Sequence, residues 1–145
     1  MTVAAAKPHT DAVVAILSVA SIAVGRGKQP AGSGWQGTPG ASVFKPYAVI
    51  YPFPGHDEPA SLARYHEALD FVFQLNFVGA IQDQVEAVMD AAGAALVGIT
   101  PAVTGRTAFP IYRVPLDRPI TRDDGVTPPV HYGVRQFHFR SEPTT

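Results

Sequence analysis

Residues 69–78 alternate between large apolar and more polar side chains, and this is the clearest pattern in the chain. Phe71, Phe73, Leu75 and Phe77 fall at every second position, with mixed residues between them. A period of two is typical of a strand that buries one face. We therefore predict a strand over 69–78, with one face in the core and the other facing solvent or a partner.

Two other segments repeat their apolar residues at helical spacing. Either Thr10 or Asp11 is a suitable N-cap for the first, which predicts a helix over 11–20. The second starts near Ala80, and Gly98 and Pro101 end it. Its apolar face consists of Ile81, Val85, Val88, Met89, Ala92 and Leu96, and its opposite, acidic face of Asp83, Glu86 and Asp90.

Shorter apolar runs rich in β-branched and aromatic residues predict the remaining strands. They cover 21–24, 47–51, 108–116 and 130–139, with a polar tail over 141–145. Pro110 indicates an edge strand or a bulge, because proline cannot donate a ladder hydrogen bond. The order of elements predicts one α+β domain over 1–145, in which two helices flank one face of a mostly antiparallel sheet.

Two long loops interrupt this pattern, over about 27–43 and 117–129. They are rich in glycine, proline and polar residues. Long loops in a compact domain are usually functional, and loops that order against a neighbouring subunit are one such case. Trp35, the only tryptophan, lies in the first loop. It either contacts a partner, as tryptophans at interfaces do, or folds back over the core.

Composition narrows the class of protein. With 145 residues, 46% of them hydrophobic and 16% charged, the chain is long enough for one buried core. The formal net charge of −1 indicates no general affinity for nucleic acid or acidic membranes. The absence of cysteine excludes disulfides and thiol catalysis. The apolar run over 12–24 is too short to span a bilayer, so we expect no membrane partner.

Charge is unevenly distributed along the chain. Residues 65–105 contain no lysine or arginine, whereas the segment from Arg106 onward has six arginines and four acidic residues. Unlike charges on separate surfaces suit head-to-tail contacts between identical subunits. An ordinary solvated surface explains the same distribution, and both interpretations remain open.

The sequence contains only weak matches to motifs of catalytic, cofactor-binding or metal-binding sites. Residues 32–37 match the dinucleotide pattern G-x-G-x-x-G, but Thr38-Pro39-Gly40 follows where a helix is required. His131 and His138 are seven positions apart in one expected strand and so lie on opposite faces. The trio His56-Asp57-Glu58 and the run Asp123-Asp124-Gly125 are typical of turns. We therefore expect no enzyme activity, no metal and no cofactor.

Five segments together resemble the tail terminator proteins of long-tailed, siphophage-type bacteriophages, especially those of actinobacteria. They are 9–14 (HTDAVV), 24–28 (VGRGK), 47–52 (YAVIYP), 71–79 (FVFQLNFVG) and 122–132 (RDDGVTPPVHY). The last combines a polar turn, Thr-Pro-Pro and an aromatic residue in the final strand. The resemblance covers roughly residues 9–140.

The resemblance implies a structural virion protein that forms a ring, typically a hexamer. Such a ring caps the head-proximal end of the tail tube, stops tube polymerisation and joins the tail to the neck. Its partners would be other copies of itself, the tail tube protein and a neck or head-completion protein. DNA would pass through the lumen without specific binding. The protein would be assembled in the host cytoplasm and would reside in the virion.

On this basis, the candidate residues for contacts with a neighbouring subunit or the tube are Trp35, Arg118, Arg122, Asp123 and Asp124. The candidates for the lumen are Asp83, Glu86 and Asp90, or alternatively the Glu67–Asp70 region. Two other functions remain open. One is another head–tail connector or head-closure ring, and the other is a small-molecule-binding or catalytic α+β domain.

Overall fold

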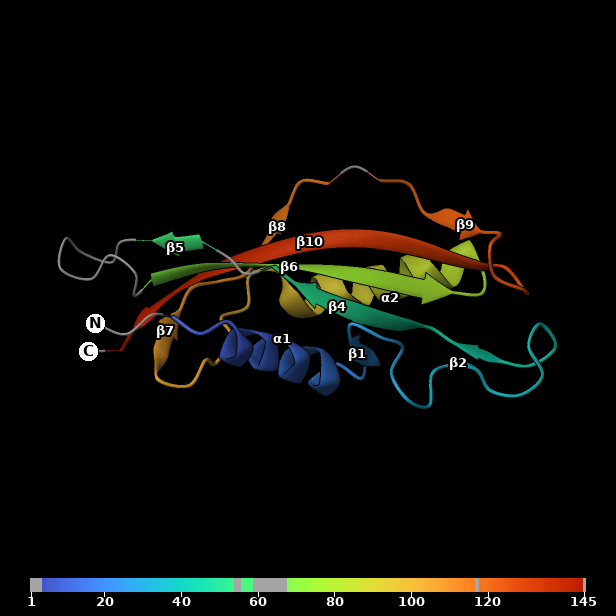
Figure 1. Ribbon diagram of the computed structural model, residues 1–145, viewed down its shortest axis with the longest axis horizontal. Helices are drawn as coiled ribbons and strands as arrows, with labels where there is room; N and C mark the ends of the chain where they lie inside the picture. Colours follow the sequence, from blue (N-terminus) through green and yellow to red (C-terminus); the bar gives the residue numbers. More distant parts are fainter. Residues whose placement is uncertain (1–3, 54–55, 59–67, 117, 145) are drawn as a thin grey trace.

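The computed structural model describes residues 4–53, 56–58, 68–116 and 118–144. A sheet forms one layer and two helices form the other (Figure 1). The elements in chain order are α1 (Lys7–Val19), β1 (Val24–Arg26), β2 (Gly34–Trp35), β3 (Phe44–Lys45), β4 (Tyr47–Pro52), β5 (His56–Glu58), β6 (Ala68–Gly79), α2 (Gln82–Leu96), β7 (Arg106–Ala108), β8 (Tyr112–Val114), β9 (Thr121–Asp123) and β10 (Val130–Pro143). The predicted α+β class is confirmed.

The two longest strands, β6 and β10, form the centre of the sheet. They pair antiparallel from His131 opposite Gly79 to Ser141 opposite Leu69. On the other side of β6 lies β4, also antiparallel, and β5 pairs with the start of β6. The short strand β1 is parallel to β4, so the sheet is mostly rather than entirely antiparallel.

The edge of β10 that faces away from β6 pairs with three short strands, which follow one another in the chain between residues 106 and 123. β7, β8 and β9 pair in turn with successive parts of β10, each antiparallel. The single strand predicted over 108–116 is therefore wrong in extent, because it is divided on either side of Pro110. The loop predicted over 117–129 likewise contains β9. Prolines at such breaks remove ladder donors and hinder pairing with a strand of another chain.

The core lies between the sheet and the helices. The four apolar side chains predicted on one face of β6 are fully buried, and Phe137 and Phe139 of β10 lie beside them. The helices contribute Ala12, Val13 and Leu17 from α1, and Val85, Met89, Ala92 and Leu96 from α2. The predicted apolar face of α2 is confirmed except at Ile81, which is the N-cap and is 54% exposed.

The first helix begins earlier than predicted. It starts at Lys7 with Pro8 in its first turn, so Thr10 and Asp11 lie inside it rather than at its cap. The Asp11 carboxylate pairs instead with Lys7 at 3.1 Å and Arg26 at 2.7 Å. Ser21 has a φ of 60°, which reverses the chain, and the strand predicted over 21–24 begins only at Val24.

The end of β10 was also predicted wrongly as a tail. Ser141 is fully buried and pairs with Leu69, because a polar cluster holds this end of the strand against α1. His9 Nδ1 lies 2.7 Å from the Ala5 carbonyl oxygen and therefore donates its proton to it. His9 Nε2 then accepts from the Ser141 hydroxyl at 2.6 Å, and Arg106 Nε donates to the same hydroxyl at 2.8 Å.

This cluster predicts a loss of stability in mild acid. Burial, and secondarily the charge of Arg106, lower the pKa of His9 below 6.5. Between pH 6.5 and that lower pKa the unfolded chain binds a proton that the folded chain does not. The free energy of unfolding should therefore fall as pH drops below 6.5, by at most about 1.4 kcal/mol per pH unit. Urea denaturation at pH 7.5 and 5.5 measures this change. A His9→Gln variant with the same pH dependence as the wild type would contradict it.

Candidate partner-binding surface

The face of the sheet opposite the helices is open in the described part of the chain (Figure 1). The residues of β6 that alternate with its buried side chains point to this face, and Gln74, Asn76 and Val78 are among them. Tyr47, Val49 and Tyr51 of β4 lie opposite Val78, Asn76 and Gln74 and point the same way. Across its middle, amides bond to one another: Gln136 Nε2 donates to Gln74 Oε1 at 3.2 Å, and Gln74 Nε2 donates to Asn76 Oδ1 at 2.8 Å. An uncharged row of amides therefore crosses the middle of this face.

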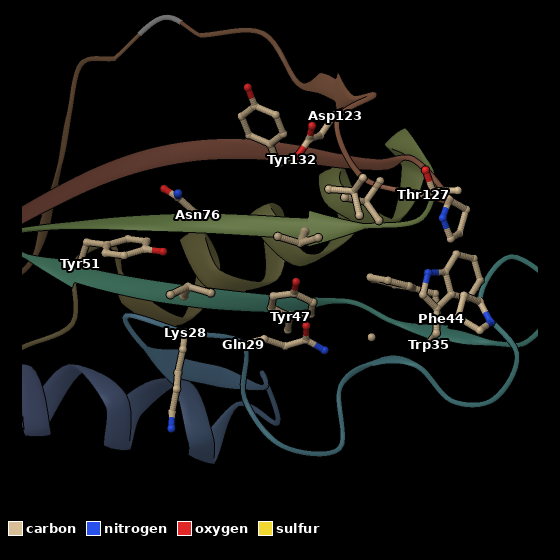
Figure 2. A pocket seen from close by; sticks show the side chains of 17 residues that line it. Lys28, Gln29, Trp35, Phe44, Tyr47, Tyr51, Asn76, Asp123, Thr127 and Tyr132 are labelled. Atoms are coloured by element: carbon tan, nitrogen blue, oxygen red, sulfur yellow. The ribbon is translucent and has the colours of Figure 1, made fainter.

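At one end of this face lies a hollow of about 550 Å³. Both loops that the sequence singled out contribute to it, along with β4, β6 and β10 (Figure 2). A Cβ atom on Gly40 would lie 3.5 Å from Pro128 Cγ, which shows how closely the two loops approach. The lining includes Lys28, Gln29, Trp35, Pro39, Phe44, Tyr47, Tyr51, Asn76, Asp123, Thr127, Pro128 and Tyr132.

Trp35 lies at one end of the hollow, on a hairpin that the sequence did not predict. β2 lies inside the segment expected to be a loop over 27–43, and it pairs with β3 directly after that segment. The indole forms a T-shaped pair with the buried Phe44 ring, with centroids 5.1 Å apart, and is itself half-buried. Trp35 therefore has a local packing partner and also a free surface that faces the hollow (Figure 2).

The other four interface candidates do not form one cluster. Only Asp123 lines the hollow, and its Oδ1 accepts a hydrogen bond from the Gly125 backbone N–H at 2.9 Å. Arg122 pairs with Asp124 at 2.5 Å, and both are exposed. Arg118 is exposed as well.

The acidic residues of α2 lie on the other side of the molecule. Asp83, Glu86 and Asp90 are exposed, and the opposite face of α2 packs on the core side of the sheet. Of the alternative lumen region, Glu67 lies outside the described residues. Asp70 points to the helix-free face, where its Oδ1 is 3.1 Å from His138 Nδ1.

The described residues offer little chemistry for catalysis. His9 and Ser141 form a base–hydroxyl pair, but both are fully buried, so a substrate cannot reach them. The glycine-rich segment over 32–37 leads into the turn before β3, and no helix follows it. No three side chains of the kinds that bind metals gather among the residues described. His131 and His138 lie on opposite faces of β10, as predicted.

Comparison with known proteins supports the fold alone. No family model matches the chain, and no curated protein is similar to it. Five solved chains are similar. One of them, whose name states no activity, covers 97% of this chain and 97% of its own length, with 18% identity and a TM-score of 0.52. Neither helix in the described ranges is long and apolar enough to cross a membrane.

Proposed function

We propose that the protein is a non-enzymatic structural subunit that forms a ring, typically a hexamer, and terminates the tail tube of a siphophage-type bacteriophage. The observation that carries the proposal is the convergence of both long loops on the helix-free face of the sheet. A face that lacks its own covering layer, bordered by two ordered loops, suits contact with other protein chains. The resemblance of the sequence to tail terminator proteins suggests that those chains are other copies of this protein, the tail tube protein and a neck protein.

A ring requires two different surfaces on each subunit, because its contacts are heterologous. The chain has such a pair. The hollow and its aromatic residues lie on one side of the sheet, and the surface formed by α1 and α2 lies on the other. The segment from Arg106 onward carries most of the arginines, and complementary charge between neighbouring subunits would favour head-to-tail assembly.

In this proposal the ring caps the head-proximal end of the tube. One side of it binds the tail tube protein, and the other binds a neck or head-completion protein. The protein is assembled in the host cytoplasm and remains in the virion. DNA passes through the lumen without specific binding, which agrees with a net charge of −1, because a basic lumen would hold the phosphates.

The acidic face of α2 provides a test of the lumen. We expect the triple variant Asp83→Lys, Glu86→Lys and Asp90→Lys to slow DNA ejection roughly tenfold at low salt, because each lysine would attract phosphates. Added salt should reduce the effect by screening. Ejection from assembled particles is measured by the release of a DNA-binding dye.

Two controls accompany this variant. Ser18→Lys adds a positive charge at an exposed position of α1, outside α2, and should leave the ejection rate unchanged. Asp83 lies in the first turn of α2, where a lysine opposes the helix dipole and costs up to about 1 kcal/mol. The stability of the triple variant is therefore checked first. If a stable triple variant ejected DNA at the wild-type rate, the proposal that the acidic face of α2 lines the lumen would be wrong.

The growth of tail tubes tests the proposed function itself. Purified tube protein is allowed to polymerise while light scattering is recorded, and this protein is added during growth. A terminator should stop the increase at amounts far below one copy per tube subunit, because only tube ends are bound. Growth that continues unchanged would contradict termination, and binding to the portal side would favour a head-closure ring instead.

A further inference from the structure

The hollow combines aromatic walls with hydrogen-bond donors that have no partner. Within the described ranges, the indole N–H of Trp35 and the hydroxyls of Tyr47, Tyr51 and Tyr132 form no hydrogen bond. Asn76 adds a donor of its own. Its Oδ1 already accepts from Gln74 at 2.8 Å, so the side of the amide left for a ligand is the NH2 group. The lining thus offers rings and donors together.

We infer that this hollow binds an extended, proline-rich segment of a partner protein. Such a segment presents flat apolar rings and backbone carbonyl oxygens, and it has few N–H groups that would need acceptors. Tyrosine and tryptophan rings with a donor at the edge are the general means by which proteins recognise polyproline II helices. The prearranged helix also loses little conformational entropy on binding.

The dimensions of the hollow suit this ligand. Tyr47 and Tyr51 are four residues apart on β4, which is roughly 13 Å along a strand. A polyproline II helix rises about 3.1 Å per residue, so this distance corresponds to about four residues of ligand. Trp35 lengthens the row beyond Tyr47, and Tyr132 and Asp123 border it on the side of β10 (Figure 2).

Other ligand classes fit less well. Single-stranded nucleic acid stacks on aromatic residues but also needs a basic groove, and this hollow has one lysine, Lys28, against one carboxylate, Asp123. An added β-strand needs a free sheet edge, whereas the hollow lies on the face of the sheet. An amphipathic helix would need a continuous apolar groove, and here the hydrogen-bonded amides of Gln74, Asn76 and Gln136 interrupt the apolar surface of the adjoining face.

The inference does not depend on the ring or the tube, because it concerns only the chemistry of the hollow. Trp35 is the only tryptophan and lies in the hollow itself, so its fluorescence reports occupancy directly. The probe is a capped decaproline peptide, which contains no tryptophan. We expect a saturable blue shift of Trp35 emission as the rings of the peptide displace water. A capped Gly-Ser decapeptide should cause no change.

Variants of Tyr132 test whether the decaproline peptide binds in the hollow. Tyr132→Ala should weaken decaproline binding at least tenfold, as expected for an aromatic anchor. Tyr132→Phe, which retains the ring and the packing, should weaken it about two- to fivefold through the lost hydroxyl donor. The matched control is Tyr112→Ala, on the same face of the sheet but outside the hollow and 56% exposed. Its affinity should equal that of the wild type.

Several results would overturn the inference. One is the absence of a saturable emission change up to about 1 mM peptide, which corresponds to negligible affinity. A second is equal weakening by Tyr112→Ala and Tyr132→Phe. A third is tighter binding of oligo(dT) than of decaproline. A fourth is a shift of Trp35 emission that appears when the protein concentration is raised and that decaproline does not reverse. This result would mean that a second copy of the chain occupies the hollow. The first three results concern only the ligand of the hollow and leave tube termination to be tested by tube growth.

Discussion

Replacing Phe73 with alanine should lower the free energy of unfolding by about 3–5 kcal/mol. Phe73 is fully buried at the centre of the core, and its ring stacks on Phe137 with centroids 5.5 Å apart and on Phe71 at 5.8 Å. The loss combines the transfer of the removed ring to water with the cavity that it leaves. Urea denaturation followed by circular dichroism at pH 7.5 measures the change.

The matched control is Phe109→Ala. Phe109 is 41% exposed and follows β7 at the edge of the sheet. Because Phe109 is only partly buried, its replacement should cost about 1–2 kcal/mol, which is clearly less than the cost of Phe73→Ala. If both phenylalanine variants changed the stability equally, the packing described for β6 and β10 would be wrong.

The second large effect concerns assembly. If the proposed function holds, Trp35→Ala should weaken binding to tube ends at least about thirtyfold, which corresponds to about 2 kcal/mol for an aromatic residue that anchors an interface. Trp35 is suited to this role because its indole packs against Phe44 and also lines the hollow. Co-sedimentation of the protein with preformed tubes at increasing concentration gives the affinity.

Stability must be measured in parallel, because Trp35 also packs locally. Trp35→Phe is the conservative comparison, since it retains an aromatic ring against Phe44 and should lose less affinity. If Trp35→Ala bound tube ends as well as the wild type did, Trp35 would serve local packing and the hollow would not be a contact with the tube.

The elements with strong periodic signals could be predicted from the sequence. The alternation around Phe73 fixed both the strand and its buried face, and the apolar spacing of α2 placed that helix correctly. The start of α1 was missed, because no side chain caps it and Pro8 supplies the signal instead. The final strand was predicted too short, because Ser141 is polar. Its burial depends on hydrogen bonds with His9, 132 positions away, and with Arg106.

The candidate surface could be predicted only in part. The two long loops and Trp35 were identified from composition, but their convergence on one face depends on the pairing of β4, β6 and β10. The register of those strands also aligns Tyr47 with Val78 and Tyr132 with Val78, which brings the two tyrosines to opposite sides of β6. Non-local pairing of this kind leaves no signal in a single sequence.

Negative-stain electron microscopy of tail tubes assembled with and without this protein tests the central claim most directly. The proposal predicts tubes of limited length with a ring at one end when the protein is present, and longer tubes with bare ends when it is absent. Tubes of equal length with bare ends in both preparations would contradict a role in tail termination.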